Sequence, residues 1–146
     1  MRHIALFVMT LMLMLTQSAT CMADDRVIPA EQLPAAAKSF IAKHFPQKKI
    51  AYAEKDGTIN ATYEARLSDG TEIEFDKRGN WDKVDCKRKA VPAALIPAAI
   101  AKYVKDNYPK AAIVKIDKER SGYEIELSNK LELKFNKSGK FVGMDD

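Results

Sequence analysis

Few side chains in this sequence are suited to acid–base or nucleophilic chemistry. Beyond residue 23 the chain has one histidine, His44, and one cysteine, Cys86. A histidine that acts as a general base needs a nucleophile and an orienting carboxylate within hydrogen-bonding reach. The position that corresponds to His44 in the second half of the chain holds Asn107, so the histidine is not repeated. We therefore expect a partly buried structural histidine and no enzyme, with a hydrolase as the enzymatic alternative.

Patterns that would bind a metal ion are also sparse. One histidine and one cysteine are too few for the usual ligands of a zinc site. Residues 76–85 (DKRGNWDKVD) are rich in carboxylates but lack the spacing and the closing glutamate of a calcium loop. The matching residues 136–145 (NKSGKFVGMD) lose most of these acids. We expect a turn in this stretch, and no metal ion or other cofactor.

Charged residues alternate with apolar ones in several segments, and this alternation would place the charges on one solvent-exposed face of a sheet. Six acids and two bases make this face acidic, although the formal net charge of the whole chain is +4. One interpretation is a solvated surface that keeps the strands soluble. The other is a shallow docking platform for a basic partner protein or peptide, where charges steer association and aromatic side chains supply affinity. The candidate binding residues are Glu64, Arg66, Glu72, Glu74, Trp81, Glu124, Glu126, Glu132 and Lys134, with Tyr52 and Phe141 as further aromatic candidates.

The elements that must position these residues occur twice in the sequence. Residues 28–46 (IPAEQLPAAAKSFIAKHFP) match residues 91–109 (VPAALIPAAIAKYVKDNYP). Residues 63–81 (YEARLSDGTEIEFDKRGNW) match residues 123–141 (YEIELSNKLELKFNKSGKF). Two copies are too few for a solenoid, which needs at least three repeats. We therefore expect a single domain, residues 24–146, made of two repeats over about 27–86 and 90–145.

Each repeat has the pattern of one helix followed by four strands. Leu33, Ala37 and Ile41 recur at helical spacing, whereas Ile125 and Leu127 alternate with acids as in a strand with one buried face. Half of such a sheet cannot cover its apolar side well, and a duplicate completes it. The sequence thus predicts an α+β fold, a tandem repeat of helix plus four antiparallel strands forming one eight-stranded sheet with two helices on one face.

Residues 1–23 have the layout of a secretory signal peptide, with a basic start, a short apolar core and an exit of small residues. The apolar run over residues 4–15 is shorter than the roughly 20 residues that span a bilayer. Cleavage after Ala23 would release the chain to the periplasm or the exterior. Cys21 leaves open the alternative of a lipid-anchored lipoprotein. After simple secretion Cys86 would be the only thiol, and we expect it to be buried and inert.

The helix motif L/I-P-A-A…F/Y-I/V…F/Y-P, the strand ending D/N-K-x-G-x-aromatic and the leader resemble PepSY-like, β-lactamase-inhibitor-like periplasmic proteins of Bacteroides-type bacteria. The resemblance covers about residues 27–145. It implies a fold similar to that of β-lactamase inhibitor protein (BLIP-like) and no catalytic residue.

These observations together lead to an expected function. We expect a secreted, non-enzymatic periplasmic binding protein that docks or inhibits an envelope protein or peptidase through its sheet face. The alternative is a small-ligand or ion sensor in the cell envelope. No dense Lys/Arg block is interleaved with aromatic residues, so nucleic acid is not expected as a partner.

Overall fold

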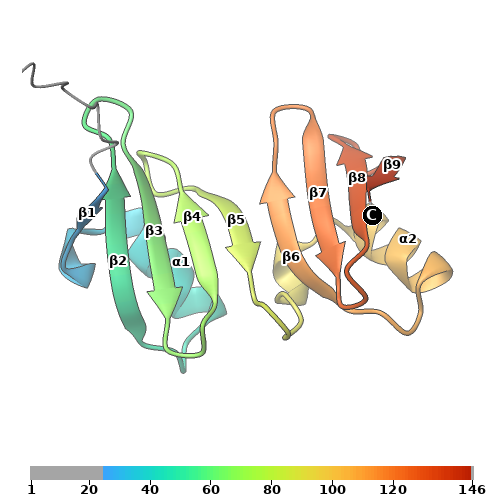
Figure 1. Cartoon of the computed structure of the whole chain (residues 1–146), viewed down its shortest axis with the longest axis horizontal. Coiled ribbons are helices and arrows are strands. Elements are labelled where there is room, and N and C mark those ends of the chain that lie inside the picture. Colours follow the sequence, from blue (N-terminus) through green and yellow to red (C-terminus); the bar gives the residue numbers. More distant parts are fainter. Residues whose placement is uncertain (1–24, 146) are drawn as a thin grey trace, which may run out of the picture.

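The computed structural model describes residues 25–145, in which the strands form one antiparallel sheet in chain order. The elements of the first repeat are β1 (Arg26–Val27), η1 (Ala30–Gln32), α1 (Ala35–His44), β2 (Ile50–Asp56), β3 (Thr62–Leu67), β4 (Glu72–Phe75) and β5 (Trp81–Asp85). Those of the second are η2 (Ala93–Leu95), α2 (Ala98–Asn107), β6 (Ile113–Lys118), β7 (Gly122–Leu127), β8 (Glu132–Asn136) and β9 (Phe141–Asp145). Both α-helices lie behind the sheet, one behind each repeat (Figure 1). The predicted α+β fold is confirmed, whereas the signal peptide and the Cys21 alternative lie outside the described residues.

Each α-helix begins directly after a proline and ends before another. Pro34 and Pro97 are the N-cap residues, where the missing N–H group of proline removes no helical hydrogen bond. Phe45 and Tyr108 are the C-cap residues, with φ values of −133° and −134°. They leave the helical conformation because the residue before a proline is sterically kept out of it.

The two repeats share one hydrophobic core between the sheet and the helices. At the junction of the repeats, Val84 of β5 lies directly opposite Ile116 of β6, and both side chains are fully buried. Ile41 of α1 and Ile100 of α2 pack into the same cluster. Each repeat therefore covers apolar surface that the other would otherwise expose to water.

The sheet has nine strands, one more than the repeats predict. The additional strand is β1, which pairs Arg26 with Lys55 and Val27 with Glu54 at the outer edge of β2. Two residues are too short a segment to show a periodicity in the sequence. β1 has no counterpart in the second repeat, because there the first strand, β6, already pairs with β5.

Candidate functional site

The eight charged candidates from the sequence are all brought together on the side of the sheet that the helices leave uncovered, here called the outer face. Cross-strand pairing arranges the residues of this face in two rows. The Arg66 row consists of Tyr52, Arg66, Glu72, Asp85, Lys115, Glu126, Glu132 and Asp145. The Glu64 row consists of Glu54, Glu64, Glu74, Lys83, Asp117, Glu124, Lys134 and Gly143.

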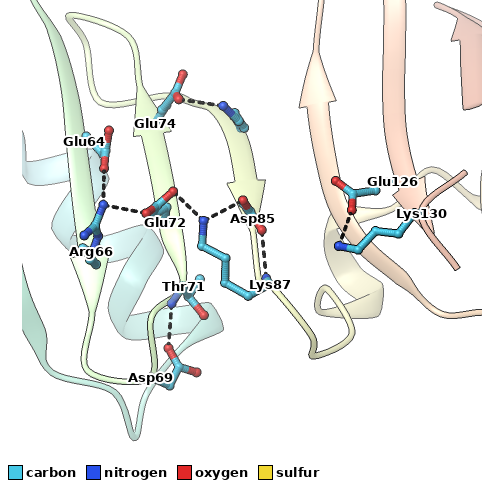
Figure 2. Close-up of polar contacts among 11 residues, drawn as sticks. Glu64, Arg66, Asp69, Thr71, Glu72, Glu74, Asp85, Lys87, Glu126 and Lys130 are labelled. Atoms are coloured by element: carbon cyan, nitrogen blue, oxygen red, sulfur yellow. Dashed lines mark hydrogen bonds and ion pairs between the residues drawn. The ribbon is translucent and has the colours of Figure 1, made fainter. Parts of the chain in front are cut away.

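A chain of ion pairs neutralises the acids of the Arg66 row in the first repeat (Figure 2). Arg66 Nη2 lies 2.6 Å from Glu72 Oε1, and Lys87 Nζ lies 2.7 Å from Glu72 Oε2. Lys87 Nζ also lies 2.8 Å from Asp85 Oδ2. Burial opposes ionisation of Asp85, but the hydrogen bonds from Lys87 outweigh it, and the pKa of Asp85 is lowered. These acids therefore already have counter-charges within the chain.

Three acids of the second repeat, Glu124, Glu126 and Asp145, have lysine partners of their own. Lys130 Nζ lies 3.0 Å from Glu126 Oε1, and Lys134 Nζ lies 3.9 Å from Glu124 Oε2. Lys134 is also paired with Asp145 of the neighbouring strand. Such exposed pairs contribute little to stability. Their consequence is that this half of the outer face presents a mixed, largely compensated charge pattern.

Three glutamates stand side by side at the start of the Glu64 row. Glu54, Glu64 and Glu74 are directly opposite one another on β2, β3 and β4. Glu74 is paired with Lys83 at 2.9 Å and Glu54 accepts a hydrogen bond from Tyr52, whereas Glu64 has a longer ion pair, 3.8 Å from Arg66. Burial raises the pKa of Glu64, and the neighbouring carboxylates raise it further. Like charges placed directly opposite destabilise a sheet, so this arrangement is not explained by stability.

The same glutamates line a hollow of about 300 Å³, here called the acidic pocket. Burial, followed by the charge of Asp76, raises the pKa of Asp82 in its wall. The repeat-equivalent positions of Glu74 and Asp82 hold Lys134 and Val142, so the second repeat has no corresponding set of acids. The lining residues are Asp25, Glu54, Asp56, Thr62, Tyr63, Glu64, Glu74, Phe75 and Asp82.

The aromatic candidates divide between the two sides of the sheet. The ring centroid of Trp81 lies 6.0 Å from that of Phe40 in α1, and Phe141 stacks on Tyr103 of α2 at 4.8 Å. Trp81 and Phe141 thus lie on the helix side, away from the charged candidates. A bulge in the pairing of β4 with β5, and another in that of β8 with β9, turns them there. Tyr52 is the aromatic candidate that lies on the outer face.

The other residues that the sequence singled out for chemistry are His44, Cys86 and the acids after β4, and each has a structural role. The ring of His44 lies 4.7 Å from that of Phe40, and burial, followed by the charge of Lys43, lowers the pKa of the histidine. Cys86 is buried as predicted, which raises the pKa of its thiol to about 11. The turn expected after β4 is confirmed, with Asp76 accepting hydrogen bonds from two N–H groups of the turn.

No group of three or more His, Cys, Asp or Glu side chains within residues 25–145 is arranged to hold a metal ion. The helices in this part of the chain are all too short or too polar to cross a membrane.

A family model described as "Putative beta-lactamase-inhibitor-like, PepSY-like" matches residues 20–60 and 61–143. The chain belongs to the PepSY-like family. This match confirms the resemblance seen in the helix and strand motifs.

Solved structures support the same conclusion for the PepSY-like chain. A "putative periplasmic protein of unknown function" from Bacteroides vulgatus is 42% identical, with a TM-score of 0.80 over 84% of this chain and 99% of its own. A "putative calcium-regulated periplasmic protein" from Bacteroides thetaiotaomicron is 44% identical, with a TM-score of 0.80 over 84% of this chain and 98% of its own. Comparison with curated protein sequences gives no match.

Proposed function

We propose that this PepSY-like chain is a non-enzymatic periplasmic binding protein that docks a basic segment of another envelope protein, such as a peptidase, on its outer face and thereby inhibits it. The β-lactamase-inhibitor-like family and the periplasmic description of similar structures support this proposal. The observation that carries it is the line of Glu54, Glu64 and Glu74 on a sheet face that no helix covers, in which Glu74 alone has a cation within 3 Å among the ion pairs of residues 25–145.

Comparison of the two repeats indicates what chemistry the partner has. In the second repeat, Lys134 Nζ lies 3.9 Å from Glu124, and in the first repeat the equivalent position of that lysine holds Glu74. A lysine or arginine of the partner, placed between Glu64 and Glu74, would supply the charge that Lys134 supplies internally. Such contacts chiefly set association rate and partner choice, and Tyr52 beside them offers an aromatic anchor.

The variant Glu64→Lys tests this proposal, with Glu124→Lys as the matched control in the second repeat. A positive charge between Glu54 and Glu74 relieves their repulsion, so we expect Glu64→Lys to fold with undiminished stability. We expect it to bind the partner about tenfold more weakly or worse, which corresponds to ~1.4 kcal/mol. Glu124→Lys should bind like the unmodified protein.

The measurement has two stages. Immobilised protein first retains partners from envelope extract, which are identified by mass spectrometry. Each partner is then purified, and its dissociation constant is measured at low and high salt for the three proteins. Binding that weakens with salt and depends on Glu64 supports the proposal. Equal binding by unmodified protein and Glu64→Lys would place docking elsewhere.

A calcium sensor is the second candidate function, and two observations favour it. The similar protein from Bacteroides thetaiotaomicron is described as "calcium-regulated". The acidic pocket of this chain is lined by six carboxylates, and Ca²⁺ takes about 6–8 oxygen ligands at roughly 2.3–2.6 Å. The acids of residues 25–145 are not gathered that closely, so the side chains would have to draw together around the ion.

Thermal unfolding in CaCl₂ and in MgCl₂ tests the calcium candidate. An ion that binds only the folded state raises its stability by mass action, and at about 100 times Kd the melting temperature should rise by roughly 5 °C or more. Mg²⁺ should give a smaller shift, because it demands octahedral geometry and retains its waters. Glu64→Gln should abolish the calcium shift and Glu124→Gln should retain it. An unchanged melting temperature in millimolar Ca²⁺ would eliminate this candidate.

A further inference from the structure

β9 is the last strand of the sheet, and its outer edge corresponds, by the repeat, to the edge of β5 that pairs with β6. β5 and β9 are the fourth strands of the two repeats, 60 residues apart, and both carry a bulge at the same position. β5 pairs with β4 through one edge and with β6 through the other, whereas β9 pairs with β8 and no strand within residues 25–145 pairs with its second edge. The pairing of β5 with β6 is therefore a template for what β9 can accept.

Three features define that template. Val84 of β5 faces Ile116 of β6 and is fully buried. Asp85 faces Lys115, so an acid lies opposite a base. Just beyond β5, the N–H group of Cys86 donates to the carbonyl of Val114 at 2.9 Å. Because successive N–H groups of a strand point to opposite edges, the N–H of Val84 points toward β6 as well.

β9 presents the first two of these features, and no strand within residues 25–145 pairs with them. Met144 takes the place of Val84 and is 51% exposed, and its backbone N–H, by the same alternation, points to the open edge. Asp145 takes the place of Asp85. The neighbouring Val142 is 62% exposed. An edge with free backbone groups and exposed apolar side chains is a site for strand addition.

The opposite edge of the sheet argues against a second copy of this chain that joins head to tail. The repeat-equivalent of β6 is β2, which would be the incoming strand if copies joined head to tail. Its edge is partly taken by β1, where Val27 pairs with Glu54, and Ile28 continues this with a hydrogen bond to Ala53 at 2.9 Å. Head-to-tail growth would have to displace these contacts.

We propose that β9 binds an extended segment of another polypeptide as a tenth, antiparallel strand. The segment resembles β6, with a lysine or arginine opposite Asp145 followed by a branched apolar residue opposite Met144. This site uses the edge of the sheet, so it is independent of the docking surface proposed for the outer face.

A peptide with the sequence of residues 112–118 of this chain (AIVKIDK), blocked at both ends, is the probe. It is titrated into the ¹⁵N-labelled protein and followed by NMR chemical shifts and amide exchange. We expect shifts along β9 and slowed exchange of the Met144 amide. Met144→Pro removes the N–H that points to the open edge and leaves the pairing with β8 in place, so affinity should fall about tenfold. Met144→Leu should bind like the unmodified protein.

The outcomes that would overturn the proposal are distinct. A peptide carrying the equivalent of Ile116→Asp should not bind, and binding as tight as that of the original peptide would show that no specific pairing occurs. Shifts confined to the outer face, shifts at Val84 through displacement of β6, no shift at millimolar peptide, or equal binding by Met144→Pro would each refute it. A Met144 amide already protected in a self-associated protein would show that a second copy occupies the edge.

Discussion

Gly79→Ala is expected to lower the free energy of unfolding by about 3 kcal/mol, which combines backbone strain with overpacking. Gly79 has a φ of +84°, in the left-handed region that side chains rarely adopt. A methyl group there would lie 2.8 Å from Cβ of Pro34 and 2.9 Å from the backbone nitrogen of Ala37. The turn between β4 and β5 therefore rests directly on the first turn of α1, and neither backbone can easily retreat.

Gly70→Ala is the matched control for this prediction. Gly70 has a similar φ of +88°, but no atom outside its own residue and its two chain neighbours lies within 4 Å of an added Cβ. It should show the backbone cost alone, about 1 kcal/mol. Urea unfolding of the two variants then isolates the contact between turn and helix as the difference. Equal destabilisation would mean that the turn moves away from α1 at no cost.

The second repeat uses the same contact, since a Cβ on Gly139 would lie 2.8 Å from Cβ of Ala99 in α2. The sequence motif around Gly79 and Gly139 predicted the turns, because glycine permits a left-handed conformation. It did not predict that the glycines face the helices. A glycine required by its φ and one required by a close neighbour look the same in a single sequence, and only packing distinguishes them.

Repetition made most of the fold predictable. Two copies of one pattern indicated the helices and eight of the strands, since each segment could be read twice with different residues. The parts that escaped prediction occur where the pattern is short or broken. β1 has only two residues, and the bulges that turn Trp81 and Phe141 toward the helices shift the alternation by one position.

The candidate site was predictable to a smaller extent. The alternation of charged and apolar residues placed the glutamates on one face of the sheet. It did not predict several of their basic partners. Lys87 and Lys130 are turn residues with φ values of 61° and 74°, from which their side chains reach back to acids of the strands. The signal that could have located the acidic pocket was the difference between the repeats, where Glu74 and Asp82 are replaced by Lys134 and Val142.

Phe75→Ala should lower the free energy of unfolding by about 3–5 kcal/mol, the cost of removing a large aromatic side chain from a packed core. Phe75 is fully buried, and its ring meets that of Phe40 edge-on at 5.7 Å. Phe135→Ala is the equivalent change in the second repeat, where the ring meets that of Tyr103 edge-on at 5.3 Å. We expect a loss of similar size there.

These two variants also test the proposal that residues 24–146 form one domain. Unfolding of either repeat alone would expose Val84 and Ile116, which cover each other at the junction, so the repeats should unfold in a single transition. Phe75→Ala should then accelerate amide exchange of the most protected residues in both repeats by the same factor. Acceleration confined to the first repeat, or two separate transitions in urea, would show two independently stable halves. In that case the two halves of the outer face could move relative to each other, and a partner bound at Glu64 would be positioned by the first repeat alone.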